Sequence, residues 1–328
     1  MAESIRIGIA GYGNLGRGVE AALAHAPDMS LAAVFSRRPP AQVHTLRPDT
    51  PVLAWDQLEA HRDAVDVLIL CGGSRSDLPV QSPQLAEWFC LVDSFDTHAN
   101  IPDHLAAVDA VSARSHTTAL ISAGWDPGLF SIARVLGEAV IPQGDTHTFW
   151  GRGLSQGHSD AVRRVPGVAA AAQYTVPSDA AIASVRAGER PQLTVADMHT
   201  RECFVVLESG ADEAAVAEAI VTMPHYFEPY ETVVEFISAE EFARDHSAMP
   251  HGGFVIRSGI SHENTPQSLE FGLTLGSNPE FTASVLVAYA RAVHRLNARG
   301  TFGAVTVLDV PPGLLHPADA AQLRADIL

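Results

Sequence analysis

The sequence is poor in cysteine and in basic residues, and it has no long hydrophobic run. Its three cysteines, Cys71, Cys90 and Cys203, lie far apart without a CxxC or Cys/His pattern, so we expect reduced thiols, no metal site and a cytoplasmic location. No run of about 18 uncharged apolar residues is present, so we expect no membrane-spanning helix, and the first residues lack the pattern of a secretion leader. The 21 basic residues, all of them arginines, stand against 38 acidic residues, a formal net charge of -17. This balance argues against a surface for nucleic acid or for an anionic membrane.

What the first third of the chain does contain is a regular alternation of short apolar runs with helical patterns. We predict strands at the apolar runs, each ended by Gly, Ser or Asp: residues 5–10, 31–36, 65–71, 90–93 and 118–122. Helices are predicted at residues 15–25, 82–89 and 103–115. Strands that alternate with helices are typical of a doubly wound parallel sheet of the Rossmann type. We therefore expect an α/β dinucleotide-binding domain over residues 1–123.

After about residue 124 the pattern becomes rich in strands and indicates a second, α+β domain over residues 124–278. The predicted strands there are residues 146–150, 170–176, 198–207, 232–237, 253–257 and 268–275, and the clearest helices are residues 178–187 and 212–222. The scarcity of helices between strands favours a mostly antiparallel sheet. A long helix follows at residues 279–299, with Asn278 as its cap. By analogy with two-domain dehydrogenases, we expect the segment 279–328 to pack back on the first domain.

A GxGxxG motif follows the first predicted strand directly and opens a helix, which is the context of a dinucleotide-binding motif. Gly11 would allow the tight turn, Gly13 the close approach of a pyrophosphate, and Gly16 the packing of helix on strand. The helix N-terminus would offer N–H groups and a positive dipole end to the phosphates. The alternative is an ordinary glycine turn.

The end of the second predicted strand indicates which dinucleotide binds. NAD-dependent enzymes usually place Asp or Glu there, whereas this chain has Ser36, Arg37 and Arg38. Guanidinium groups bind a 2′-phosphate bidentately, and an acid would repel it, so the sequence favours NADP; the alternative is a solvated arginine pair. Two further strand ends, residues 71–74 and 94–96, should line the same crevice, although the glycines of the first could form only a turn.

Asp96 and Asp126 both follow predicted strands on this side of the sheet. A pair of carboxylates there would hold an ammonium group beside the nicotinamide. Each aspartate also has an ordinary alternative: Asp126, followed by Pro127, could cap a helix, and Asp96 could belong to a polar turn. The residues alone leave both interpretations open.

Seven longer motifs carry a resemblance that extends from end to end of the chain. They are residues 11–17 (GYGNLGR), 35–38 (FSRR), 122–128 (SAGWDPG), 147–151 (HTFWG), 153–161 (GLSQGHSDA), 249–253 (MPHGG) and 278–284 (NPEFTAS). Together they resemble the meso-diaminopimelate dehydrogenase family. The resemblance implies a Rossmann-type domain, a second domain that binds substrate and dimerises, and a homodimer. It also implies NADP-dependent, reversible oxidative deamination of meso-diaminopimelate to L-2-amino-6-oxopimelate and ammonium.

The resemblance further implies a role for individual residues. The catalytic pair Asp96 and Asp126 would hold the reacting D-amino group, and Trp150 would wall that pocket. The residues that seat the substrate and clamp its distal L-centre would be Gln156, Gly157, Thr175, Arg201, His251 and Asn278. The cofactor would be bound by Gly11, Tyr12, Gly13, Asn14, Leu15, Gly16, Ser36, Arg37, Arg38, Cys71, Gly72, Gly73, Ser74, Ser94, Phe95, Asp96, Ala123, Gly124, Trp125, Asp126 and Pro127.

Without the resemblance, these side chains have plainer interpretations and the chain has rival functions. Arg201 would be a solvated strand residue, His251 an ordinary loop histidine and Trp150 a core residue. Residues 153–157 also fit GxSxG, the nucleophile elbow of hydrolases. That elbow needs a strand that runs into the serine and a helix after it, whereas we predict a polar loop. The other rivals are a related NADP-dependent D-amino-acid dehydrogenase and a non-catalytic NADP-binding sensor.

Overall fold

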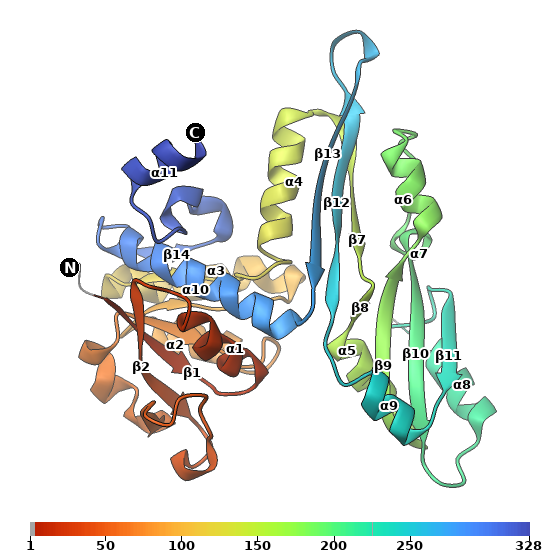
Figure 1. The fold of residues 1–328 in the computed structure, drawn as a ribbon, viewed down its shortest axis with the longest axis horizontal. Helices are drawn as coiled ribbons and strands as arrows, with labels where there is room; N and C mark the ends of the chain where they lie inside the picture. The colour runs from red at the N-terminus through yellow and green to blue at the C-terminus, as the bar shows by residue number, and fades with distance from the viewer. Residues whose placement is uncertain (1–3, 225) are drawn as a thin grey trace. The chain divides into compact units, whose positions relative to one another are not determined.

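The computed structural model describes residues 4–224 and 226–328, which form two compact units (Figure 1). Unit 1 comprises Met1–Ile132 and Pro279–Leu328, and unit 2 comprises Ala133–Asn278. Unit 1 therefore includes residues 124–132, which the sequence analysis placed in the second domain. Among the described residues, no helix has the length and apolar composition that crossing a membrane requires.

Unit 1 is built on a seven-stranded sheet in which every neighbouring pair of strands is parallel. The strands are β1 (Ile5–Ala10), β2 (Met29–Ser36), β3 (Val52–Ala54), β4 (Val67–Leu70), β5 (Cys90–Val92), β6 (Thr118–Leu120) and β14 (Gly303–Val305). Their order is β14-β6-β5-β4-β1-β2-β3, so the winding direction reverses between β1 and β4. Doubly wound sheets bind ligands at the carboxyl ends of strands beside such a reversal. The predicted Rossmann-type fold class is confirmed, and β3 and β14 are strands that the sequence analysis did not predict.

Helices cover both faces of this sheet, and each face has its own hydrophobic core. The helices of unit 1 are α1 (Asn14–Leu23), α2 (Leu78–Leu85), α3 (Ile101–Ser115) and α11 (Ala320–Ile327), together with nearly all of α10 (Asn278–Asn297). On one face, Ile7 and Ile9 of β1 share a core with Tyr289 of α10. On the other, Leu68 and Leu70 of β4 share a core with residues of α2 and α3. Burial on both faces explains why these strands are nearly continuous apolar runs.

Helix α2 differs in position from the prediction, which placed it at residues 82–89. It begins at Leu78 and ends at Leu85, with Pro83 inside it. Both of these leucines are buried in the core that α2 and α3 share with β4. Burial of Leu78 and Leu85 therefore fixes the position of the helix. Pro83 lies inside the helix and not at its start.

Unit 2 contains two sheets, whereas the sequence analysis expected one. A four-stranded sheet has the order β11-β10-β9-β8, and a three-stranded antiparallel sheet has the order β13-β12-β7. The strands are β7 (Gln143–Trp150), β8 (Gly153–Leu154), β9 (Val168–Pro177), β10 (His199–Leu207), β11 (Thr232–Phe236), β12 (His251–Ile260) and β13 (Pro266–Leu275). The pairing of β10 with β11 is parallel, so the expectation of mostly antiparallel pairing holds with this exception.

Six helices accompany these sheets, and the sequence analysis predicted two of them. They are α4 (Leu129–Val140), α5 (Gln156–Arg163), α6 (Asp179–Arg186), α7 (Val195–Met198), α8 (Glu213–Val221) and α9 (Ala239–Asp245). Helix α4, of which residues from Ala133 onward belong to unit 2, runs beside β12 in Figure 1. A Cβ on Gly137 would lie 2.9 Å from the Cβ of Arg257, so glycine permits this close packing. The buried Arg257 side chain donates to the carbonyl oxygen of Ile141 just after α4.

Candidate functional site

The glycine motif forms a tight turn between β1 and α1. Gly11 has φ of 96°, a conformation that favours glycine. A Cβ on Gly16 would lie 2.3 Å from the carbonyl oxygen of Gly11, so any side chain there would push the helix off the turn. Gly13 occupies the N-cap of α1, and a Cβ placed on it would meet no atom within 4 Å. Open space in front of a helix N-terminus fits a pyrophosphate group.

The two arginines at the end of β2 lie beside this turn. Arg38 donates to the carbonyl oxygen of Tyr12 and, through its backbone N–H, to Ser36 Oγ at 3.0 Å. Arg37 is 62% exposed and forms a two-point ion pair with Asp77, at 2.8 and 2.9 Å. The Arg37 guanidinium holds the pKa of the Asp77 carboxyl below its usual range. The sequence analysis missed Asp77, because nothing in the local pattern around it points to a partner at Arg37.

Asp77 also shapes the loop that follows β4. Its carboxylate accepts from the backbone N–H of Gly73 at 2.9 Å. A Cβ on Gly72 would lie 2.7 Å from Gln81 Oε1, so this loop requires glycine beside α2. Desolvation raises the pKa of the Cys71 thiol well above its usual value, so the thiol stays protonated and is no nucleophile. The loop after β4 therefore presents its backbone at the carboxyl edge of the sheet.

Asp96 and Asp126 follow β5 and β6, which are neighbours in the sheet. Asp96 is exposed, and its backbone N–H donates to Ser74 Oγ at 2.8 Å. Asp126 is half-buried and lies in a turn that precedes α4. Because the helix begins at Leu129, its N-cap position is Gly128, and Asp126 is not the cap. Both aspartates therefore lie on loops at the carboxyl edge of the sheet.

In unit 2, Arg201 and Thr175 are cross-strand neighbours on β10 and β9. Arg201 is buried, donates to Thr175 Oγ1 and lies 4.0 Å from the ring centroid of Tyr230. Its Nε is buried without a hydrogen-bond partner, and no acidic side chain of the described chain pairs with it. Burial lowers the pKa of this guanidinium. A buried cation that lacks a counter-ion fits a carboxylate supplied by a ligand.

Trp150 is held by His199, a residue that the sequence analysis did not single out. The backbone N–H of Trp150 donates to His199 Nε2 at 2.8 Å, and the two rings stack with centroids 5.3 Å apart. His199 Nδ1 lies 3.0 Å from the carbonyl oxygen of Val195, which fixes the tautomer with the proton on Nδ1. Burial lowers the pKa of His199 from 6.5 to about 4, so the ring is neutral at neutral pH.

The stability of the protein should therefore fall as the pH drops from 6.5 to 4, partly through His199. The unfolded chain takes up a proton on this residue below 6.5, whereas the folded chain resists protonation until about 4. The His199→Gln variant keeps an acceptor for Trp150 but has no titratable ring. We expect its melting temperature, measured by calorimetry, to fall less over this range than that of wild type, with exposed His25→Gln as the control. A melting temperature that falls as steeply with pH in His199→Gln as in wild type would contradict the assignment.

Residues 249–251 bring the remaining candidates of unit 2 together. The Gln156 side chain donates to Met249 Sδ at 3.1 Å, and the backbone N–H of Asn278 donates to the Met249 carbonyl oxygen at 2.9 Å. His251 packs on the backbone at Gly153, where a Cβ would lie 2.4 Å from its ring. Burial lowers the pKa of His251. Met249, which contacts both Gln156 and Asn278, was not predicted as a site residue.

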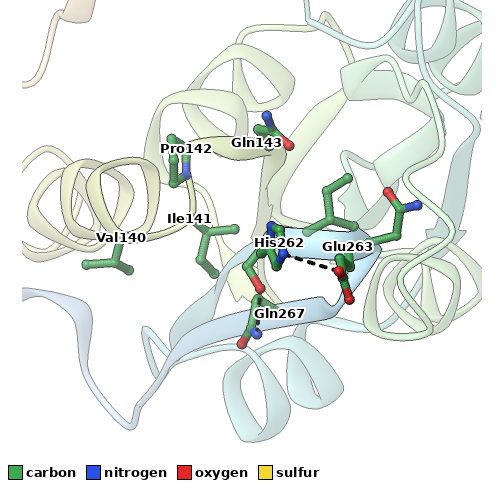
Figure 2. Close-up of a pocket in the computed structure, with 10 residues that line it drawn as sticks. Val140, Ile141, Pro142, Gln143, His262, Glu263 and Gln267 are labelled. Carbon is green, nitrogen blue, oxygen red and sulfur yellow. Dashed lines mark hydrogen bonds and ion pairs between the residues drawn. The ribbon is translucent and has the colours of Figure 1, made fainter.

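Two cavities of unit 2 differ in their relation to these residues. One, of about 760 Å³, has His251 in its wall, together with Arg152 and Phe254. The other, of about 470 Å³, lies between the end of α4 and the turn that joins β12 to β13, and none of the candidate residues lines it (Figure 2). Among the residues described, no three His, Cys, Asp or Glu side chains gather as metal ligands.

The GxSxG segment is not the polar loop that we predicted. Gly153–Leu154 forms β8 and α5 begins at Gln156, so a strand does run into a helix at Ser155. Ser155 is the N-cap of α5, and its Oγ lies 2.8 Å from His158 Nδ1. Burial, and then the charge of Arg201, lowers the pKa of His158 to about 4. Such a ring is a weak base, and Ser155 serves as a cap, which speaks against the hydrolase interpretation.

Comparisons with known proteins agree along the whole chain. Residues 124–277 match the family described as the diaminopimelic acid dehydrogenase C-terminal domain. The meso-diaminopimelate D-dehydrogenase of Lysinibacillus sphaericus is 59% identical over 326 residues, which cover 99% of this chain and all of that protein. A solved structure of an engineered D-amino acid dehydrogenase bound to NADP+ is 45% identical, with a TM-score of 0.86, and covers 99% of this chain and 100% of that one.

A third relative is a mutant meso-diaminopimelate dehydrogenase of Clostridium tetani, solved with DAP. It is 48% identical, with a TM-score of 0.94, and covers 99% of this chain and 100% of that one. Its six substituted residues match, in type, order and spacing, a set in this chain: Gln156, Thr175, Arg201, Pro250, His251 and Asn278. The fold, the site and these identities lead to one conclusion: the chain belongs to the meso-diaminopimelate D-dehydrogenase family.

Proposed function

We propose that this protein catalyses the NADP-dependent, reversible oxidative deamination of the D-centre of meso-diaminopimelate, which gives L-2-amino-6-oxopimelate and ammonium. The observation that carries the proposal is Arg201, a buried guanidinium beside Thr175 with an unpartnered Nε and no acidic partner among the residues that the structure describes. A binding site for a second carboxylate is what distinguishes a diaminopimelate enzyme from one for simple D-amino acids. A relative that is named for this reaction and is 59% identical over nearly the whole chain supports it.

The cofactor site is proposed at the carboxyl ends of β1, β2 and β4. The open space at Gly13 and the uncapped N-terminus of α1 would receive the pyrophosphate. Arg37 and Arg38 would grip the 2′-phosphate, because no acid follows β2 directly to hold unphosphorylated ribose. When bound, NADP+ accepts the hydride that leaves the D-carbon. The glycine loop and the residues after β4 would position it by backbone contact.

The Arg37→Ala/Arg38→Ala double variant should lose affinity for NADP far more than for NAD. Each charge-assisted contact to the 2′-phosphate is expected to contribute roughly 10- to 100-fold in affinity, and NAD has no such phosphate. Dissociation constants from titration of NADPH and NADH fluorescence measure both effects. Arg114→Ala, at an exposed position in the last turn of α3, is the control. Equal losses for the two cofactors would contradict the assignment.

Each unit carries one set of candidate substrate-binding residues. Asp96 and Asp126, in unit 1, would bind the ammonium group of the D-centre and accept the proton that it loses before hydride departs. Thr175, Arg201 and the other candidates of unit 2 would bind the amino-acid group of the L-centre. Both substrate ends are zwitterions, so a fixed site for the L-centre is needed to decide which carbon reacts.

We also propose that the protein is a cytoplasmic homodimer. Apolar side chains that are exposed in the single chain support dimerisation: Val135, Leu136 and Val140 of α4, at 49%, 54% and 65%, and Phe271 of β13 at 37%. Such exposure is typical of surfaces that a partner covers. The three free cysteines support a reducing compartment. Sedimentation equilibrium measures the oligomeric state directly.

The proposed reaction is tested by the absorbance of NADPH on addition of the meso, L,L and D,D isomers of diaminopimelate to enzyme and NADP+. We expect NADPH to form with the meso isomer alone. Silence with all three would favour an NADP-binding sensor. Equal rates with simple D-amino acids would favour a general D-amino-acid dehydrogenase.

A further inference from the structure

A buried carboxylate lies directly before the loop that carries Asp96. Asp93 follows β5 and is completely buried, yet it is not among the residues expected to touch substrate or cofactor. A buried acidic side chain is costly unless hydrogen bonds satisfy its oxygens. Each of the two Asp93 carboxylate oxygens makes two such contacts. One oxygen binds backbone amides of the loops, and the other binds side chains of the helices.

Oδ1 of Asp93 accepts from two backbone amides, one on each of the two aspartate-bearing loops. The N–H of Phe95, next to Asp96, donates at 3.1 Å. The N–H of Ser122, at the start of the loop that leads to Asp126, donates at 2.9 Å. The carbonyl oxygen of Asp93 adds a third bond, from the N–H of Ala123 at 2.9 Å. One residue therefore ties together the loops after β5 and β6.

Oδ2 of Asp93 faces the helices that cover the sheet. Ser82 of α2 donates its hydroxyl at 2.6 Å, and His104 Nε2 of α3 lies 2.8 Å away. The His104 ring also stacks on Phe95, with centroids 4.2 Å apart. The carboxylate is thus fixed from the helix side while it fixes the loops on the other side.

The Ser122 backbone needs this support. Its φ is 58°, in the left-handed region that residues other than glycine rarely occupy. Strained backbone persists at functional sites only where surrounding contacts hold it. The amide that Asp93 holds belongs to this residue, four positions before Asp126.

We propose that Asp93 is a positioning residue, which sets the relative placement of Asp96 and Asp126 through its Oδ1 bonds to both loops. This inference rests on the proposed roles of the two aspartates. The acceptor oxygen matters for this function more than the charge. Asparagine in its place keeps an acceptor for both amides, and its NH2 group can donate to Ser82 Oγ, and to His104 Nε2 once that ring carries its proton on Nδ1. Alanine removes every contact.

The kinetic test compares Asp93→Ala with Asp93→Asn in the full-length protein. We expect Asp93→Ala to lower kcat roughly 100-fold, because misplacement of reacting groups by about 1 Å has effects of this size. Asp93→Asn should stay within roughly tenfold of wild type, because its acceptor bonds are neutral and weaker. The dissociation constant of NADPH should change far less than kcat in either variant, because the proposed pyrophosphate and 2′-phosphate contacts lie after β1 and β2. A kcat that falls equally in both, or in neither, would overturn the proposal.

The matched control is the ion pair of Asp28 with Arg291, also in unit 1. Arg291 is buried, and its guanidinium donates to Asp28 at 2.6 and 2.7 Å. Asp28 precedes β2, at the opposite edge of the sheet from the aspartate loops. Asp28→Ala should lower the melting temperature but leave kcat at wild-type level below the transition. A similar loss of kcat in Asp28→Ala would assign the Asp93→Ala effect to general destabilisation.

Amide hydrogen exchange tests the placement without any substrate. In wild type, the amides of Phe95 and Ser122 should exchange slowly although both lie in loops. Both should exchange faster in Asp93→Ala and remain protected in Asp93→Asn. Rapid exchange of both amides in wild type would overturn the proposal even if Asp93→Ala fails to fold. If wild type were inactive on meso-diaminopimelate but showed the expected exchange, the proposed function would fail and the anchoring of the loops by Asp93 would stand.

Discussion

The Arg201→Met variant should lose most of its activity on meso-diaminopimelate and yet be as stable as wild type, or more stable. In the free protein the buried guanidinium has no counter-ion and one unpartnered N–H group, so its burial disfavours folding. Replacement of a buried charge by an apolar side chain of similar volume is often neutral or stabilising. In the complex the same guanidinium would pair with the carboxylate of the L-centre. Loss of that pair should cost about 3–5 kcal/mol, or roughly 10²- to 10³-fold or more in kcat/KM.

Arg257→Met is the matched control for this variant, because Arg257 is a second buried arginine of unit 2. Its guanidinium donates to the carbonyl oxygens of Ile141 and Pro142, which hold the end of α4. Its replacement should lower the melting temperature, because those carbonyl groups lose their donors. Calorimetry and steady-state kinetics on both variants separate the two roles. A large fall in melting temperature for Arg201→Met, with near-normal kcat/KM, would show that Arg201 is structural.

The Asp126→Asn variant should lower kcat/KM for meso-diaminopimelate roughly 10²- to 10⁴-fold, the range typical of a positioned acid–base group. Asparagine keeps the size of the side chain, so the turn closed by Gly128 should persist. It cannot balance the ammonium charge or accept a proton from it. Because asparagine keeps one side-chain acceptor oxygen as well as the size, the melting temperature should change little.

The measurement for Asp126→Asn combines initial rates with NADPH titration. We expect the affinity for NADPH to change far less than kcat/KM, because the proposed pyrophosphate and 2′-phosphate contacts lie at the glycine motif and after β2. Asp103→Asn, at an exposed position in the first turn of α3, is the control and should behave as wild type. Unchanged turnover in Asp126→Asn would remove this residue from the proposed site.

The sequence predicted most of the Rossmann-type unit because its strands are buried on both faces. Strand β1 was predicted at residues 5–10, where it is found, since an apolar run between polar ends leaves little freedom. Strands β3 and β14 are the edge strands of the sheet and are only partly buried, so they lack the continuous apolar run of the inner strands. Helix α4 was not among the predicted helices, although Asp126 and Pro127 were recognised as a possible helix start.

For the site, the sequence predicted residue types at strand ends better than the contacts that hold them. The arginines after β2 could be found because their position relative to the glycine motif is fixed by the fold. Asp77 and its partner Arg37 are 40 positions apart, and Asp93 joins two loops and two helices. Pairings of this kind depend on the tertiary arrangement, so single-sequence patterns do not contain them. From the residues alone Arg201 looked like a solvated strand residue; the family resemblance pointed to it as a clamp, and its burial beside Thr175 fits that interpretation.

If the amino-acid group of the L-centre is clamped as proposed, the D-carbon alone gives up its hydride. Two samples of meso-diaminopimelate, one deuterated at the D-carbon and one at the L-carbon, decide this point. Mass spectrometry of the NADPH formed should show deuterium from the first sample and none from the second. Deuterium transferred from the L-carbon, or from both, would contradict the account.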